Sequence, residues 1–343
     1  MAAQRDSWRI LDANGNRAAE GLRVLEDIAR FVLDDVRIAR MAKELRHAVR
    51  AAIPAEAAAS RDAGEDVGAD SPAPGGIDRA RLVDLVRANA ARVQEALRAA
   101  EEAARLLVPT AASALEAARY RAYQLESAVL SRLPAWLMHR VRLYAIIDTA
   151  LCADPEAVAA AAARGGAGAI QLRAKGLAER SYRELAARVQ QAVRAAGALF
   201  IVNDHVAVAR ALGADGVHVG QDDLDPRDVR AVVGARTAIG VSAHTREQAL
   251  AAIASGADYL GLGPMYATAT KPHEPCRGPE LLDELRGNLG IPSYAIGGLD
   301  ADRIRALRAR IPHGVAVAAA ICRAADPERA ASELHWILEP EES

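Results

Sequence analysis

The stretch IVNDHVAVARALGADGVHVGQDDL, residues 201–224, decides the fold of the longer part of the chain. An apolar run ends in Asn203-Asp204, a short segment with helical spacing follows, and a second apolar run ends in QDD. Two β-branched runs joined by a helical segment are typical of parallel strands with a crossover helix. The stretch therefore predicts a strand–helix–strand unit with acidic residues at the end of each strand.

The same alternation runs from about residue 140 to the C-terminus. Eight candidate strands can be counted, at 142–148, 169–175, 199–204, 216–221, 237–244, 259–266, 292–298 and 314–321. A helical segment follows each strand, and the last is PERAASELHWIL. This pattern predicts a TIM (β/α)8 barrel domain over residues 140–343. A doubly wound open sheet is the alternative, but the Gly-rich first turn of that fold is missing.

The N-terminal residues 1–135 have helical periodicity throughout, interrupted by the Gly/Pro/Asp-rich segment 61–76. Within this part, a set of residues recurs at an offset of 75. The repeated residues are Asn14, Arg17, Glu20, Leu22, Arg23, Glu26, Ala29 and Arg30, matched by Asn89, Arg92, Glu95, Leu97, Arg98, Glu101, Ala104 and Arg105. The repeat predicts an all-α helical-bundle domain made of two related hairpins, whose second helices lie near 37–50 and 112–130.

A helical wheel of the first repeat puts Arg17 inside the apolar arc and Glu26 on the opposite, charged face. The repeat extends this expectation to Arg92. An arginine on a core face needs a partner. Either neighbours of Glu20 and Glu95 form buried salt bridges with these arginines, or the arginines bind a phosphate.

Composition limits the partners and the compartment. With 43 basic and 45 acidic residues, the formal charge of −2 gives no reason to expect nucleic acid or a membrane surface as a partner. Cys152, Cys276 and Cys322 lack the spacing of a zinc site or a disulfide framework. The charged N-terminus does not resemble a signal peptide. We expect a cytoplasmic protein, and a homo-oligomer is left open.

Polar residues gather where the predicted barrel strands end, which is where TIM barrels carry their active sites. They are Gln171, Arg173 and Lys175 after the second strand, Asn203 and Asp204 after the third, Gln221, Asp222 and Asp223 after the fourth, Ser242 and His244 after the fifth, and Thr268, Thr270 and Lys271 after the sixth.

The acids after the third and fourth strands suggest a metal site. Neighbouring strands lie roughly 5 Å apart, so one acid from each can converge on a hard cation. Mg²⁺ takes few protein carboxylates and completes its shell with water and substrate phosphates, and the basic residues nearby favour a diphosphate. The alternative is that Asp204 and either Asp222 or Asp223 cap helices. Capping, however, does not call for Arg and Lys at alternate positions of the second strand.

A second anion site is suggested at the seventh and eighth strands. Gly297 and Gly298 follow the seventh strand, and the eighth runs into small alanines. Backbone N–H groups at this place commonly hold a phosphate in TIM barrels.

Seven of these motifs, QLRAK, VND, GVHVGQDD, GVSAH, DYLGLGPMYATATK, AIGG and GVAVAAAI, occur in the order and spacing of the thiamine phosphate synthase family. The resemblance covers residues 141–338. It implies that hydroxymethylpyrimidine diphosphate is held by Gln171, Arg173, Lys175, Asn203, Ser242 and Lys271, with Arg173, Lys175, Ser242 and Lys271 as the catalytic groups. It also implies Mg²⁺ ligation by Asp204 and Asp223 rather than Asp222, and thiazole phosphate binding by Thr268, Thr270, Gly298 and the backbone of Ala318 and Ala319.

The implied reaction forms thiamine phosphate after diphosphate has departed. It needs stabilisation of the leaving group more than a general base, so we expect no nucleophile–base pair, and structural hydrogen bonds for His218 and His244. The chain departs from the family at Ala319, where a serine is common. A related thiazole tautomerase would need neither the acids nor the basic strand end.

The segment RILDANGNRAAEGLRVLEDIARFVLDD, followed by KELRH and RDAGEDVG, resembles the helical domain that precedes the synthase in some bacteria. The resemblance covers about residues 7–133 and implies an alternative hydroxymethylpyrimidine phosphate kinase that uses ATP. Candidate contacts for ATP, Mg²⁺ or the substrate are Asn14, Arg17, Glu20, Arg92, Glu95, Asp62, Glu65 and Asp66. The alternative is a purely structural or dimerisation module.

Overall fold

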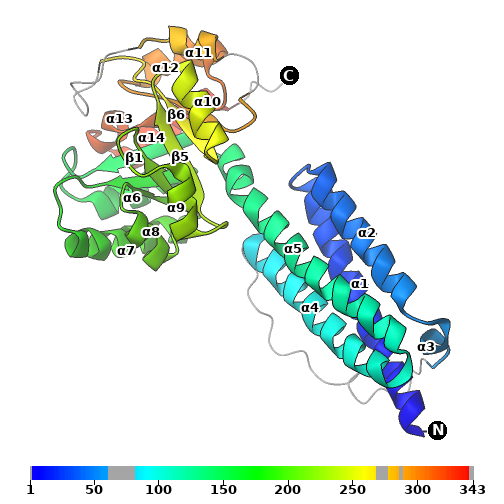
Figure 1. Ribbon diagram of the computed structural model, residues 1–343. Coiled ribbons are helices and arrows are strands. Elements are labelled where there is room, and N and C mark those ends of the chain that lie inside the picture. The colour runs from blue at the N-terminus through cyan, green and yellow to red at the C-terminus, as the bar shows by residue number, and fades with distance from the viewer. Residues whose placement is uncertain (1, 61–81, 268–276, 286–288, 340–343) are drawn as a thin grey trace. The chain divides into compact units, whose positions relative to one another are not determined.

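The computed structural model of the chain describes residues 2–60, 82–267, 277–285 and 289–339 (Figure 1). The chain forms two compact units, Met1–Leu133 and Pro134–Ser343. Among the described residues, no helix combines the length and the apolar character that crossing a bilayer demands.

The first unit is helical, as the sequence predicts. Its helices are α1 (Ala2–Phe31), α2 (Val36–Ala52), α3 (Ala55–Ala59), α4 (Leu82–Leu107) and α5 (Pro109–His139), which continues past the end of the unit. α1 packs against both α2 and α4. The carboxylate of Asp35 caps α2 by accepting from the N–H of Ile38 at 3.2 Å. The sequence had not predicted the short helix α3.

The repeated residues build the shared core of this unit. Leu22 and its counterpart Leu97 are fully buried. α1 and α4 approach closely at Gly21, where a Cβ would lie 2.7 Å from Cγ2 of Val93 and 3.1 Å from the carbonyl oxygen of Asn89. A side chain at this position would push the two helices apart, so glycine is needed here.

The expected burial of Arg17 and Arg92 is wrong. Both arginines are exposed, whereas the carboxylates Glu26 and Glu101 are buried at 3 % and 0 % exposure. Glu26 is buried because α1 packs against more than one helix, so its buried surface extends beyond the single apolar arc of the wheel. The buried salt bridges therefore belong to Glu26 and Glu101.

The second unit contains a closed barrel of eight parallel strands in the order β1 to β8. The strands are β1 (Leu143–Asp148), β2 (Ala169–Arg173), β3 (Leu199–Asn203), β4 (Gly216–Val219), β5 (Ala238–Ala243), β6 (Tyr259–Leu262), β7 (Ser293–Ile296) and β8 (Gly314–Val317). Closure confirms the predicted TIM barrel and excludes the open sheet.

The helices of this unit follow the strands along the chain (Figure 1). They are α6 (Pro155–Arg164), α7 (Glu179–Ala195), α8 (Val206–Leu212), α9 (Pro226–Val233), α10 (Arg246–Ala254), α11 (Glu280–Glu284), α12 (Ala301–Leu307), α13 (Ala319–Cys322) and α14 (Pro327–Leu338). A 3-10 turn at Arg308–Arg310 follows α12. The final helix is the predicted PERAASELHWIL segment.

The parallel register brings all the strand ends to one rim of the barrel. Arg173 of β2 pairs with Asp148 of β1, and Asn203 of β3 pairs with His218 of β4. Below this rim the interior is filled by Tyr144, with its ring 5.9 Å from that of Tyr259. The barrel is therefore a packed core with a site built at its C-terminal end.

Candidate active site

The rim of the barrel encloses a pocket of about 440 Å³. It is lined by ten of the substrate and metal contacts that the family resemblance implies, namely Gln171, Arg173, Lys175, Asn203, Asp204, Asp223, Ser242, Gly298, Ala318 and Ala319. Thr268, Thr270 and Lys271, also expected at the site, lie outside the described residues.

Asp204 and Asp223 are brought together at the ends of the third and fourth strands. The N–H of Asp204 donates to the carbonyl of His218 at 2.9 Å, which fixes Asp204 against β4. Burial, and then the negative charge of Asp223, raises the pKa of the Asp204 carboxyl, and the charge of Lys175 opposes this rise. The Nζ of Lys175 lies 3.9 Å from Oδ2 of Asp204. The two acids therefore form a negative pair with one cation beside it.

Neither acid caps a helix. The residue before α8 is His205, and no side chain there caps the helix. α9 is capped by Asp225, whose carboxylate accepts from the N–H of Arg227 at 2.8 Å. Asp223 instead accepts from the N–H of Gly220 at 2.7 Å, which holds its carboxylate at the rim. The capping explanation for these acids is thus excluded.

The sequence analysis missed the partner of Arg173. The carboxylate of Asp148 is buried, with 2 % exposure, and accepts a hydrogen bond from Nη1 of Arg173. Asp148 also accepts from the N–H of Ala150 at 3.0 Å. A carboxylate fixed in this way determines where the guanidinium points. The signal in the sequence was an acid ending the first strand.

A network of hydrogen bonds crosses the barrel and includes residues that line the pocket. Nε2 of Gln171 donates to the hydroxyl of Tyr144 at 2.7 Å, and that hydroxyl lies 3.0 Å from the hydroxyl of Tyr259. The chain continues from Tyr259 to Nδ1 of His218 at 3.3 Å and from Nε2 of His218 to Oγ of Ser242 at 3.0 Å. Two expected substrate contacts, Gln171 and Ser242, are held at its ends.

This hydrogen-bond network contains a serine–histidine pair, which we did not expect. Such a pair can activate a nucleophile when a carboxylate supports the histidine. Here the other side of His218 contacts Tyr259, and burial raises the pKa of that phenol well above its usual value. A neutral phenol does not stabilise an imidazolium as a carboxylate does, so the pair fixes the hydroxyl of Ser242. His244 also makes a structural contact, with Nδ1 2.6 Å from the carbonyl of Gly263.

The seventh and eighth strands supply the opposite side of the rim. Gly298 has φ +62°, and a Cβ there would lie 2.8 Å from Cβ of Tyr266, so this turn requires glycine. Ala319 begins α13, and the first N–H groups of a helix have no acceptor within it. Arg303 and Arg323 line the pocket on this side, after strands seven and eight, and the sequence analysis gave neither a role.

The candidate residues of the helical unit are distributed differently. Nδ2 of Asn14 donates to the carbonyl of Ile10 at 2.9 Å within its own helix. Arg17, Glu20, Arg92 and Glu95 are exposed. The remaining candidates, Asp62, Glu65 and Asp66, lie outside the described residues.

A closed (β/α)8 barrel with acids, arginines and a glycine turn at its C-terminal rim defines an enzyme of the TIM-barrel class. The family profile described as thiamine monophosphate synthase matches residues 143–321. The chain belongs to this family. The profile of the ThiD2 family matches residues 9–128.

Curated relatives align over most of the chain. A thiamine-phosphate synthase of Gloeobacter violaceus is 39 % identical over 333 residues, covering 96 % of each chain. One of Nostoc punctiforme is 39 % identical over 303 residues, covering 88 % of this chain and 85 % of the relative. Among solved structures, a thiamine phosphate pyrophosphorylase of Pyrococcus furiosus has a TM-score of 0.55 and 35 % identity, covering 59 % of this chain and 97 % of its own.

Proposed function

We propose that the barrel condenses hydroxymethylpyrimidine diphosphate with thiazole phosphate to give thiamine phosphate and free diphosphate. The observation that carries this proposal is the convergence of Arg173, Lys175 and the Asp204–Asp223 pair in one pocket. A leaving diphosphate needs positive charge and a hard metal ion, and this group of residues offers both kinds of contact.

The carboxylate pair fits Mg²⁺. The raised pKa of Asp204 reflects partial burial of its carboxyl and the charge of Asp223, and a bound cation would relieve that repulsion. In the described part of the chain, no cluster of three or more His, Cys, Asp or Glu residues is arranged to hold a metal. Two protein carboxylates suit Mg²⁺, which keeps waters and substrate oxygens as its other ligands. When bound, the metal would neutralise charge on the diphosphate.

The remaining residues have separate roles in this proposal. Arg173, Lys175 and Lys271 stabilise the negative charge that develops on the departing diphosphate, with Asp148 holding the guanidinium of Arg173 in place. Gln171, Asn203 and Ser242 orient the pyrimidine diphosphate. The C–O bond to diphosphate breaks first and leaves a pyrimidine methyl cation. The thiazole nitrogen then donates its electron pair to that carbon.

The thiazole phosphate is assigned to the opposite side of the rim. The turn at Gly298 and the backbone N–H groups at Ala318 and Ala319 are the proposed phosphate contacts, together with Thr268 and Thr270. Arg303 lies in the same part of the pocket lining and adds positive charge there.

The direct test supplies purified protein with the pyrimidine diphosphate, thiazole phosphate and Mg²⁺. We expect equal amounts of thiamine phosphate and diphosphate. Diphosphate without thiamine phosphate would instead indicate a hydrolase that uses Ser242 and His218. Conversion of a thiazole tautomer in the absence of the pyrimidine substrate would indicate the tautomerase alternative.

We also propose that the helical unit phosphorylates hydroxymethylpyrimidine phosphate with ATP, which would supply the barrel with its diphosphate substrate. The match of residues 9–128 to the ThiD2 family favours this second function. The test replaces the pyrimidine diphosphate by the monophosphate and ATP. Thiamine phosphate formation supports the kinase. Product only from the diphosphate leaves the helical unit as a structural or dimerisation module.

A further inference from the structure

A hollow of about 540 Å³ lies between α1 and α2 of the helical unit. Arginine side chains from both helices reach it. Its lining consists of Asn16, Ala19, Glu20 and Arg23 from α1, and Arg46 and Arg50 from α2. Its three arginines face Glu20 in the lining, and Arg46 and Arg23 pair with acids beside it, so the hollow is rich in guanidinium donors without a net positive charge.

Arg46 is the fixed element of this hollow. It is buried, with 8 % exposure, and its Nε and Nη2 donate to Oε2 of Glu26 at 3.1 and 2.8 Å. Its Nη1 has no hydrogen-bond partner among the residues that the structure describes. The ion pair with Glu26 thus holds the guanidinium in one orientation and leaves a donor unused.

The two other arginines are weakly paired. Arg23 contacts the half-buried Asp27, with Nε 3.3 Å from Oδ2. Arg50 has no hydrogen bond or ion pair with any described residue. Both side chains are exposed, and a guanidinium carries five N–H donors. The hollow therefore contains more cationic donors than its own acids use.

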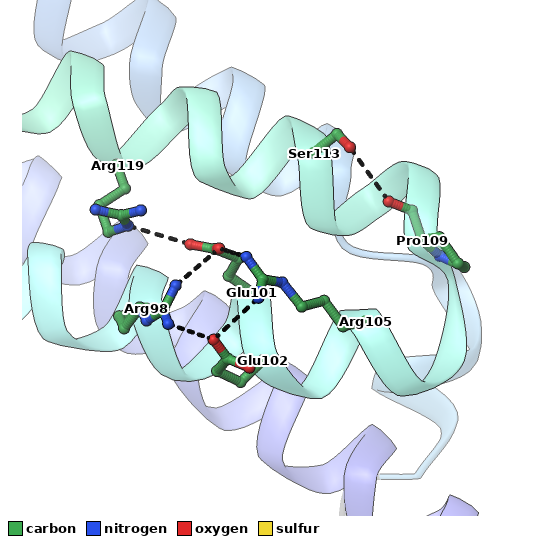
Figure 2. Close-up of polar contacts among 7 residues, drawn as sticks. All are labelled: Arg98, Glu101, Glu102, Arg105, Pro109, Ser113 and Arg119. Carbon is green, nitrogen blue, oxygen red and sulfur yellow. Dashed lines mark hydrogen bonds and ion pairs between the residues drawn. The ribbon is translucent and has the colours of Figure 1, made fainter.

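The second repeat uses the equivalent arginine differently, as Figure 2 shows. Arg98, the counterpart of Arg23, donates to Glu101 at 2.9 Å and contacts Glu102 at 2.6 Å. In the first repeat these two acids correspond to Glu26 and Asp27. Arg98 thus forms ion pairs with two acids of its own helix, whereas Arg23 forms an ion pair with one.

The arginine that reaches the buried glutamate from a neighbouring helix differs in the same way. Nε of Arg119 donates to Glu101 at 3.1 Å, as Arg46 donates to Glu26. The guanidinium of Arg119, however, lies 4.9 Å from the ring centre of Tyr120, which covers it. In the second repeat, acids and an aromatic ring cover the arginine cluster. In the first repeat, the arginines face the hollow.

We propose that the hollow between α1 and α2 binds the phosphate group of a small phosphorylated molecule. Arginine forks match the geometry of phosphate oxygens, and the hollow brings arginines of two helices to one place. Asn16 and Glu20 provide hydrogen-bonding groups for the rest of the ligand. The inference concerns binding alone, and it stands whether or not the helical unit transfers phosphate.

The test is hydrogen–deuterium exchange of the full chain, with inorganic phosphate compared against chloride at equal ionic strength. We expect phosphate to slow exchange in peptides from α1 and α2. Arg50→Gln should raise the phosphate concentration needed for this protection about tenfold, the loss of one charge-assisted contact. The matched control is Arg40→Gln, which removes the same charge from an exposed position on α2 outside the hollow.

Protection lost in Arg50→Gln and retained in Arg40→Gln supports the site. Absence of protection in the wild type, or equal behaviour of both variants, overturns it. Peptides from the barrel report phosphate at the rim separately, so this result does not depend on the synthase proposal. Hydroxymethylpyrimidine phosphate and ATP are tested in parallel arms. An ester that protects α1 and α2 at lower concentration than inorganic phosphate identifies the occupant, and weaker protection by both contradicts a small-molecule ligand.

Discussion

Nζ of Lys175, beyond the end of β2, lies 3.9 Å from Oδ2 of Asp204 at the end of β3. The cation sits beside an acid whose other neighbour is Asp223, so the negative pair is partly neutralised without metal. In our account Lys175 competes with Mg²⁺ for the acids and then contacts the departing diphosphate.

This relationship predicts opposite effects of Lys175→Met on two quantities. Removing a positive charge beside the acids should lower the Mg²⁺ concentration that gives half-maximal rate. The maximal rate should fall at least about tenfold, because the diphosphate loses a charge contact. Steady-state rates over a Mg²⁺ titration measure both, with Lys175→Arg as the charge-conserving control. A variant whose rate falls while its Mg²⁺ requirement rises would contradict the competition.

Asp148 is predicted to act through Arg173. Asp148→Asn keeps the shape of the side chain but weakens its hold on the guanidinium, so kcat should fall by about 100-fold, as expected for a misplaced catalytic group. Circular dichroism should show a folded protein. The exposed Asp302→Asn serves as the control for loss of one negative charge. If Asp148→Asn keeps the wild-type kcat, Arg173 does not depend on this carboxylate.

Glu101 is predicted to stabilise the helical unit in a pH-dependent way. Burial tends to raise the pKa of its carboxyl, but the hydrogen bond and charge of Arg119 and the charges of Arg98 and Arg105 outweigh burial and lower it. A carboxyl whose pKa is lowered by folding stabilises the fold at pH values above its pKa in the unfolded chain. That stabilisation is lost as the pH falls through the pKa of the carboxyl in the folded protein. The wild-type protein should therefore lose stability as the pH falls below 4.5, the ordinary pKa of a glutamate carboxyl.

Glu101→Gln removes this dependence. At neutral pH it should cost about 2 kcal/mol, since the largely covered Arg119 loses its charged partner. Its stability should vary less with acid than that of the wild type, as measured by urea unfolding followed by circular dichroism at several pH values. The neighbouring Glu102→Gln, half exposed, should change little. Parallel pH profiles for Glu101→Gln and the wild type would rule this explanation out.

The family resemblance implies that serine is common at the position of Ala319. Ala319→Ser adds a hydroxyl at the start of α13, and one hydrogen bond of about 1 kcal/mol should lower the KM for thiazole phosphate roughly fivefold. The KM for the pyrimidine diphosphate should stay unchanged. A KM for thiazole phosphate that is unchanged or higher would count against the proposed phosphate contact.

Much of the barrel could be predicted because its signals are local. Each strand is a short β-branched run, and polar residues such as Asp204 and Ser242 mark where strands end. Long-range partners could not be predicted in this way. The pairing of Asp148 with Arg173 and the contact of His218 with Ser242 depend on the register between neighbouring strands and on side-chain packing in the closed barrel.

The helical unit illustrates the other limit. The repeat located its helices and its leucines correctly, since both follow from periodicity alone. The wheel nevertheless put Arg17 in the core and Glu26 outside, because one helix cannot reveal how many neighbours it has. The placement of Arg46 opposite Glu26 comes from the packing of α2 against α1.

The central claim is that Asp204 and Asp223 hold Mg²⁺ against the departing diphosphate. Its most direct test is the Mg²⁺ dependence of thiamine phosphate formation in Asp204→Ala, Asp223→Ala and Asp222→Ala. Our account predicts that the first two lose at least about 100-fold in rate at saturating substrate, partly recovered by high Mg²⁺, while Asp222→Ala behaves like the wild type. Normal turnover in Asp204→Ala, or an equal loss in Asp222→Ala, would contradict it.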